Sequence, residues 1–247
     1  MLVLLPPSEG KAPGGDGPPL ELSALSRPAL TPARQRALVA LGQAARSDPE
    51  GLRRALGCPA DQVALDAALT TSPTLPALRR YTGVVYDALG YATLPAAARR
   101  RADASLAVAS ALFGLLSPRD RVPAYRLSAG TSVPGLGALA ALWRPVLEPE
   151  LQGARGVVVD LRSGPYAALA RVPGAVQVRV LREADGRRTV VSHDNKWTKG
   201  RLARALCEHG ARGVRDVAEA GRELCDAVEV TGRCVDLVLH GLARARP

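Results

Sequence analysis

Gly156-Val157-Val158-Val159-Asp160-Leu161 is the stretch that decides the fold class, because a short apolar run rich in valine predicts a buried strand. A second such run, Leu2-Val3-Leu4-Leu5, begins the chain and is stopped by Pro6. The chain therefore builds part of its core from strands.

Hairpins and helices alternate in the second half of the chain. Two hairpins are predicted: residues 175–181 with 188–192 across the turn 184–186, and residues 228–231 with 234–239 around Gly232. Helices are expected at about 199–207 and 214–226. Lys199 and Gly200 would then open a helix whose free amides can hold an anion.

The first half of the chain is dominated by helical periodicity. Helices are expected at 32–46, 48–56, 61–69, 75–89 and 136–147, and residues 95–116 are expected to form one or two helices, the second strongly apolar. We predict one α+β domain over residues 1–247, helix-rich at 30–147 and mixed at 156–240. Its mixed β-sheet is flanked by helices.

Composition and charge narrow the function classes. The chain has 247 residues, 47% of them hydrophobic, and a formal net charge of +10. A domain this basic is expected to bind phosphate groups, in nucleic acid, in a nucleotide or on an anionic surface. Arginines scattered over a solvated surface are the alternative.

Signals for export, membrane insertion and metal binding are missing from the sequence. Leu2–Leu5 has no basic segment before it, and no run approaches the ~18 apolar residues of a membrane span. We therefore expect a cytoplasmic protein without a membrane partner. The cysteines have no CxxC spacing, and the histidines are far apart, so we predict buried free thiols, no metal site and no cofactor.

Lysine is rare in this chain, which makes its positions informative. Of 33 basic residues, 30 are arginine and three are lysine, namely Lys11, Lys196 and Lys199. A lysine kept in an arginine-rich chain suggests a compact charge, a titratable amine or a nucleophile. Lys11 follows the first strand, where phosphate-handling residues often lie, although Gly10-Lys11 is not a P-loop. Three chance surface lysines remain the alternative.

Several segments, taken in order, resemble the YaaA family of peroxide stress proteins. They are residues 2–5 with Pro7 and Lys11, then 81–86 (YTGVVY), 112–118 (LFGLLSP), 123–127 (PAYRL) with Gly130, 142–144 (LWR), 160–166 (DLRSGPY), and 196–200 (KWTKG) with Arg204. Each segment is weak alone, but the ordered set covers residues 1–205.

The resemblance implies a mixed α/β fold with a basic cleft, and protection from hydrogen peroxide by limiting free iron and oxidative DNA damage. It also implies DNA binding through a helix-hairpin-helix-like element, for which residues 32–69 are the candidate, with 56–59 as the hairpin. The chain departs from the family pattern in the loop Ser8-Glu9-Gly10 and in carrying Lys199 where relatives tolerate arginine.

A set of residues is predicted to hold an anionic ligand: Lys11, Ser8, Arg126, Tyr125, Ser163, Tyr166, Lys196, Lys199 and Arg204. Arg126 suits bidentate contact with phosphate or carboxylate, and its assignment rests mainly on the family pattern. Ser163 follows a buried strand, a usual place for ligand contacts. Tyr86, Tyr166 and Trp143 either stack on bases or anchor the core.

Two functions of different class fit these residues. The first is a DNA-binding peroxide stress protein whose basic cleft contacts backbone phosphates independently of sequence. The second is an enzyme acting on a nucleotide-like or other phosphorylated small molecule, in a pocket that joins Lys11, Arg126 and Lys196. The sequence leaves open whether the chain is an enzyme.

Catalysis in the second case would use a neutral lysine. Lys196 and Lys199 would repel each other's charge, so that one of them is neutral at physiological pH and acts as base or nucleophile. Glu9 or Asp194 would accept the proton.

Overall fold

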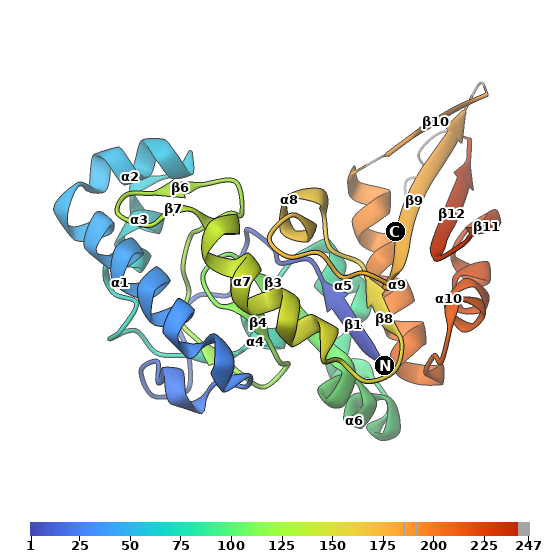
Figure 1. Cartoon of the computed structure of the whole chain (residues 1–247), viewed down its shortest axis with the longest axis horizontal. Coiled ribbons are helices and arrows are strands. Elements are labelled where there is room, and N and C mark those ends of the chain that lie inside the picture. The colour runs from blue at the N-terminus through green and yellow to red at the C-terminus, as the bar shows by residue number, and fades with distance from the viewer. Residues whose placement is uncertain (185, 191, 242–247) are drawn as a thin grey trace.

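A mixed β-sheet runs through the molecule (Figure 1). The computed structural model describes residues 1–184, 186–190 and 192–241, with the backbone alone at 192 and 193. Within them the strand order is β11-β12-β9-β8-β1-β3-β4, and β10 pairs with β9. The bounds are β1 Leu2–Leu5, β3 Leu106–Ser110, β4 Gly114–Leu116, β8 Val158–Asp160, β9 Val176–Ala184, β10 Arg187–Thr189, β11 Ala227–Thr231 and β12 Cys234–His240. The predicted α+β class with a mixed sheet is confirmed.

The centre of the sheet is parallel and apolar. β1 pairs in parallel with both β3 and β8, and β9 pairs in parallel with β8 and β12. β3 and β8 are buried along their whole length. Strands covered on both faces carry continuous apolar runs, which is why the valines at 157–159 predicted this element correctly. Both predicted hairpins are present as β9–β10 and β11–β12, although Asp185 and Val191 lie outside the described residues.

The prediction for residues 95–116 is wrong in its second part. α6 spans Ala96–Ser105, but the apolar run that follows it forms β3, a turn and β4. Every residue from Leu106 to Leu116 is buried, and a run without a polar face shows neither helical nor strand periodicity. Gly114 begins β4 with a φ of 74°, a left-handed conformation that glycine adopts without strain.

The single helix expected at 75–89 is interrupted. The segment contains β2 (Leu75–Pro76), α4 (Ala77–Arg80) and α5 (Val84–Leu89), and β2 pairs with β5 (Arg121–Val122). Gly83 separates the two helices with a φ of 98°. The interruption brings Tyr81 and Thr82 against the loop after β1.

The other helices of the first half agree with the prediction. They are α1 (Thr31–Ser47), α2 (Pro49–Leu56), α3 (Ala60–Ala67) and α7 (Leu139–Gln152). Short elements complete this half: 3₁₀ turns at Leu22–Ala24, Pro28–Leu30 and Tyr91–Thr93, and the strand pair β6 (Ser132–Val133) and β7 (Gly137–Ala138). In Figure 1, α1, α2 and α3 lie at the end of the molecule opposite to β9–β12.

Helix α9 (Ser192–His209) begins earlier than expected. Lys199 and Gly200 therefore lie inside the helix, so the expectation that they open it is wrong. Gly200 is needed for packing, since a Cβ there would lie 2.3 Å from the carbonyl oxygen of Val85 in α5. Helices α8 (Gly164–Ala167) and α10 (Val214–Gly221) and a 3₁₀ turn at Arg222–Leu224 complete the fold.

One hydrophobic cluster extends from β1 through α1 to β12. That the chain forms a single domain stays a prediction. No helix in the described part of the chain combines the length and the apolar character needed to cross a membrane.

Candidate functional site

The carboxyl ends of β1, β3 and β8 meet at one edge of the sheet, because the three strands are parallel. Ligands of α/β proteins commonly bind outside this edge. The loop after β1 carries Lys11, β3 ends at Ser110, and β8 ends at Asp160. Two clusters of buried polar side chains form here, one around Lys11 and one around Asp160.

The Lys11 amine rests on aromatic rings. Its Nζ lies 4.1 Å from the ring centroid of Tyr125 and 5.4 Å from that of Tyr81. It also donates to the backbone oxygens of Ser8 at 3.3 Å and Glu9 at 3.4 Å. A β-bridge between Lys11 and Tyr81 fixes the backbone. The amine is thus held from two sides by its own loop and by the rings.

A chain of buried hydroxyl groups orients these rings. The hydroxyl oxygens of Tyr81 and Tyr125 are 2.6 Å apart, and that of Tyr125 is 2.8 Å from Oγ of Ser110. Ser110 Oγ in turn accepts from the backbone N–H groups of Leu112 and Phe113 in the turn after β3. The end of β3 therefore sets the position of the surface on which Lys11 lies.

Asp66 and Arg126 complete the cluster. Asp66, from α3, is fully buried, and its Oδ1 accepts from the backbone N–H of Arg126 at 2.8 Å. Its Oδ2 is buried and has no hydrogen-bond partner among the described residues. The Arg126 guanidinium donates from Nη2 to Glu9 at 3.1 Å, and its side chain is 15% exposed whereas that of Glu9 is 75% exposed. The partly buried Arg126 guanidinium is thus paired with a carboxylate that is exposed to solvent.

Burial shifts the pKa values of both titratable groups of this cluster close to neutral pH. Loss of hydration, and then the positive charge of Arg126, lower the pKa of Lys11 to about 7. Burial raises the pKa of Asp66 to about 7, against the opposing effects of Arg126 and Lys11. The site therefore holds an unprotonated amine and a protonated carboxyl in large fractions at neutral pH, a combination typical of functional sites.

The cluster around Asp160 is saturated with hydrogen bonds. Arg162 donates to both Asp160 oxygens, at 2.9 Å and 2.8 Å, and both side chains are 2% exposed. Burial raises the pKa of Asp160, but the hydrogen bonds and charge of Arg162 outweigh it, so that the pKa is lowered. Lys199 donates to the backbone oxygen of Arg162 at 3.4 Å, and burial lowers its pKa.

Comparison with known proteins identifies the family. The model of the family described as peroxide stress protein YaaA matches residues 1–224. The chain belongs to this family. It is 48% identical over 242 residues to a UPF0246 protein of Streptomyces coelicolor, covering 93% of this chain and 92% of that protein. It is also 42% identical over 242 residues to a UPF0246 protein of Corynebacterium efficiens, covering 96% and 95% of the two chains.

This member of the YaaA family brings together only part of the predicted site. Lys11, Ser8, Glu9, Tyr125 and Arg126 lie in one cluster.

Two further predicted residues follow β8, at the same edge of the sheet. Tyr166 is partly buried, and burial followed by the nearby Tyr81 raises its pKa. Glu9 and Arg126 have smaller effects on this pKa, so Tyr166 lies near the cluster. Ser163 is the N-cap residue of α8 and is exposed.

Other predicted residues lie elsewhere. Arg204 donates to the backbone oxygens of Leu89 and Gly90, each at 3.2 Å, and so caps α5. Lys196 is exposed, and within the described residues no hydrogen bond or ion pair joins it to Lys11 or Arg126. That these three side chains share a pocket stays a prediction. Repulsion by Lys196 is also not among the causes that lower the pKa of Lys199.

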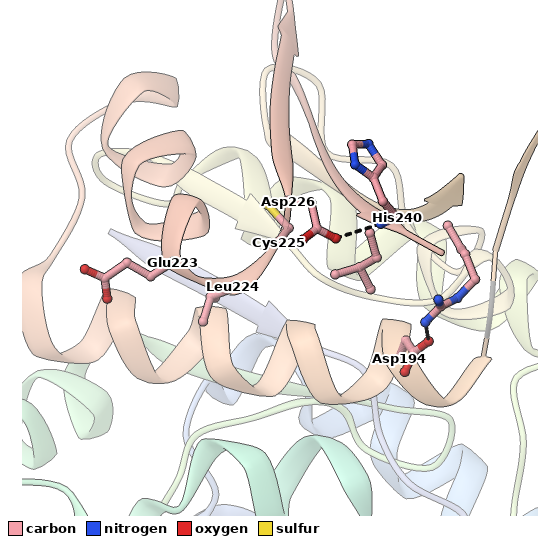
Figure 2. Close-up of a pocket in the computed structure, with 8 residues that line it drawn as sticks. Asp194, Glu223, Leu224, Cys225, Asp226 and His240 are labelled. Atoms are coloured by element: carbon pink, nitrogen blue, oxygen red, sulfur yellow. Dashed lines mark hydrogen bonds and ion pairs between the residues drawn. The ribbon is translucent and has the colours of Figure 1, made fainter. Parts of the chain in front are cut away.

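Asp194 lines a separate pocket of about 200 Å³ (Figure 2). It forms an ion pair with Arg182 of β9, and the pocket is closed by the segment 223–226 and by His240. Asp226 accepts there from the backbone N–H of His240 at 2.7 Å. Asp194 is thus paired with Arg182, and its role as proton acceptor for Lys196 or Lys199 stays a prediction.

The stacking candidates belong mainly to the core. Trp143 is fully buried and donates from Nε1 to the backbone oxygen of Ala111 at 2.8 Å, and Tyr86 donates to that of Pro6 at 2.8 Å. All four cysteines are free, and Cys58 and Cys207 are buried. No group of three or more histidine, cysteine or acidic side chains suited to a metal ion occurs in residues 1–184, 186–190 and 194–241.

Sequence reasoning missed Asp66, Tyr81 and Ser110 as members of the cluster. Asp66 lies three residues after Val63 on the buried face of α3, and an acidic residue at an apolar position is the signal that would have found it. Tyr81 belongs to a segment that carried the family resemblance, but its contact with Lys11 depends on the break at Gly83.

Proposed function

We propose that this YaaA family member binds DNA without reading its sequence and thereby limits iron-linked oxidative damage. The net charge of +10 supports this, because each cation placed on a backbone phosphate releases a counterion and contributes affinity. The observation that carries the proposal is the supply of exposed arginines without a carboxylate partner.

These arginines occur on several elements. Each is exposed and forms no side-chain ion pair or hydrogen bond with another described residue: Arg36, Arg54, Arg100, Arg155, Arg187, Arg215 and Arg233. An unpaired guanidinium keeps its five donors for phosphate oxygens. By contrast, Arg119 is held by Asp103.

The segment α2–turn–α3 supports the helix-hairpin-helix-like element that the resemblance implies. α2 ends at Leu56, Gly57 takes a left-handed conformation with φ 58°, and α3 begins at Ala60. Arg53 and Arg54 lie in the last turn of α2, and Arg54 is free of ion pairs. We infer that Arg54 contacts a phosphate.

Fluorescence anisotropy with duplexes of unrelated sequence tests this proposal. The affinity is expected to fall by about 10³ between about 50 and about 200 mM salt, with similar values for all sequences. Arg54→Ala should weaken every complex and reduce the salt slope by about 1, and Arg119→Ala, which removes the same charge from an ion pair, should do neither. An affinity independent of salt would contradict the proposal.

Protection is tested in cells. A strain lacking the gene should show more iron-dependent DNA breaks after peroxide than one carrying the wild-type protein, and Arg54→Ala should restore only part of the protection. Full protection by a variant that no longer binds DNA in vitro would show that protection does not depend on DNA binding, and would contradict that part of the proposal.

A second candidate function is binding or turnover of a phosphorylated small molecule. The ion pair between Arg126 and the exposed Glu9 favours it, because a ligand anion can replace that carboxylate on the guanidinium. A thermal-shift comparison of nucleotides and sugar phosphates tests this candidate. Stabilisation by one of them that is lost in Arg126→Ala supports it, and no stabilisation by any of them contradicts it.

A further inference from the structure

We propose that Lys11 forms an imine with an aldehyde that also carries a phosphate group, with Asp66 as the proton donor and Arg126 as the phosphate ligand. The inference goes beyond non-covalent DNA binding. Only the case in which the aldehyde is an abasic deoxyribose within DNA rests on the function proposed above.

The amine meets the requirements of a nucleophile. Lys11 is partly buried, and its Nζ lies over the faces of Tyr125 and Tyr81 without any carboxylate in hydrogen-bond contact among the described residues. Imine formation needs the unprotonated amine, and a lysine in an apolar pocket beside a second cation is the usual way to obtain it. Arg126 is that cation.

Two neighbouring groups fit the other roles in the proposal, namely binding of the phosphate and donation of a proton. Glu9 is held by the Arg126 guanidinium at 3.1 Å and is largely exposed, so its carboxylate marks an anion position that a phosphate can take over. Asp66 is fully buried, and its Oδ2 has no partner although its Oδ1 is fixed. A buried oxygen without a partner is costly unless the carboxyl is protonated or a ligand completes it.

The step balances without an oxidant or reductant. The Lys11 nitrogen attacks the carbonyl carbon, a C–N bond forms, and the carbonyl electron pair moves to oxygen. After one N–H proton shifts to that oxygen, the carboxyl proton of Asp66 converts the hydroxyl into water, which leaves as the C=N bond forms. An amine, an aldehyde and a carboxylic acid thus become an iminium, water and a carboxylate. A pair of neutral groups becomes an ion pair, and the attraction between the iminium and the carboxylate offsets part of the cost of forming charges in a poorly hydrated site.

The charged groups around Lys11 decide how the reaction depends on pH. They are Arg126 and Glu9 at the site, Asp66 on α3 and Arg80 on α4; Asp66 and Glu9 raise the pKa of Lys11, and Arg126 and Arg80 lower it. With a pKa of about 7, the fraction of neutral amine rises about tenfold between about pH 6 and about pH 8, and the fraction of protonated Asp66, whose pKa is also about 7, falls by the same factor.

Reductive trapping tests the proposal on the wild-type chain. The protein is incubated with cyanoborohydride and either a duplex containing one abasic deoxyribose or glyceraldehyde 3-phosphate, and the modified peptide is mapped by mass spectrometry. We expect the adduct on Lys11, and not on Lys196, Lys199 or the Met1 amine. The labelling rate of Lys11 should be highest near about pH 7, because the neutral amine is lost below this pH and the Asp66 proton is lost above it.

Three variants and a probe without phosphate complete the experiment. Lys11→Arg should lower the adduct at least ~20-fold, because a guanidinium stays protonated, while Lys196→Arg keeps the full yield. Asp66→Asn should slow trapping, and glyceraldehyde without phosphate should react less than its phosphate ester. Because the rates of the three lysines are compared within the wild-type chain, the result does not depend on whether Lys11→Arg folds.

Each outcome decides between the proposals. An adduct on Lys11 with the abasic duplex assigns the site to DNA, and an adduct with only the small aldehyde assigns it to a metabolite; both support the imine. Absence of any Lys11 adduct, or preferential labelling of Lys196 or Met1, overturns it. Anisotropy on the same samples reports DNA binding separately, so a duplex that binds without being trapped leaves the proposed function intact.

Discussion

Two buried aspartates lie near the same edge of the sheet. They differ in how many hydrogen bonds their carboxyl oxygens accept. Asp160 receives two hydrogen bonds from the Arg162 guanidinium and one from the Arg162 backbone N–H, and its pKa is lowered. Asp66 receives one hydrogen bond from a backbone N–H, leaves its second oxygen without a partner, and has a pKa raised to about 7. Both residues are aspartates, but their pKa values are shifted in opposite directions.

The difference separates a structural cluster from a candidate functional one. A buried carboxylate with a bidentate arginine holds its loop in one geometry and has no capacity left for a ligand. A carboxyl beside a poorly hydrated amine keeps capacity for hydrogen bonding and for proton transfer, at a cost in stability. The predictions below test this distinction through stability, pH dependence and reactivity.

The largest effect is expected for Arg162→Ala. Removing the guanidinium leaves Asp160 charged and buried at 2% exposure, which should lower the free energy of unfolding by about 3–5 kcal/mol. Arg179→Ala is the matched control, because Arg179 also donates to both oxygens of an aspartate, Asp236, but is 60% exposed. The control should cost less than about 1 kcal/mol.

Urea unfolding of both variants measures this difference. Equal losses in Arg162→Ala and Arg179→Ala would show that the Asp160 cluster is not the structural element proposed. Loss of Lys11 trapping in a folded Arg162→Ala protein would show instead that the two clusters are not independent.

A smaller effect, dependent on pH, is expected for Asp66→Asn. The folded chain keeps the Asp66 proton up to about pH 7, whereas the unfolded chain releases it near about pH 4, so the folded state binds more protons between these values. The stabilising contribution of the protonated group is complete below about pH 4 and is lost as the pH rises through about 7. Relative to Asp66→Asn, the wild type should therefore lose about 2–4 kcal/mol over this window.

Asp160→Asn provides the control of opposite sign. The pKa of Asp160 is lowered in the folded state, so its contribution is present at neutral pH and is lost as the pH falls through the folded value. Asp160→Asn should destabilise the chain at neutral pH, and the gap to wild type should close in acid. If the two variants share one pH profile, the assignment of opposite states to the two aspartates is wrong.

The fold was predictable where polar residues mark the faces of the elements. The helices at 32–46, 48–56 and 61–69 and both hairpins alternate apolar and polar positions or contain turn residues. The run from Leu106 to Leu116 offers no such contrast, because every one of its residues is buried in the centre of the sheet. Only the pairing of β3 with β1 distinguishes it from a helix, and pairing between distant segments is not a local property.

The sequence indicated which cations to examine for a site, but it did not indicate which groups surround them in the structure. The rarity of lysine singled out Lys11, whose pKa is lowered in the structure, but it grouped Lys11 with Lys196, which is exposed. Burial, and not repulsion within a lysine pair, lowers the pKa of Lys11 and Lys199. Asp66 approaches Lys11 only because α3 packs behind residue 126, a contact 60 residues apart in sequence.

The smallest effect is expected for Tyr125→Phe, which removes the hydroxyl group of Tyr125 and keeps its ring. The substitution removes hydrogen bonds to Tyr81 and Ser110, and since Ser110 keeps the backbone N–H groups of the β3 turn, the loss of stability should be about 1 kcal/mol. The phenyl ring stays under the Lys11 amine, so the trapping yield should change less than about threefold. A large loss of trapping in a stable Tyr125→Phe protein would mean that the hydroxyl chain moves protons during imine formation. Asp66 would then no longer be the donor, and the proton path would run through β3 instead of α3.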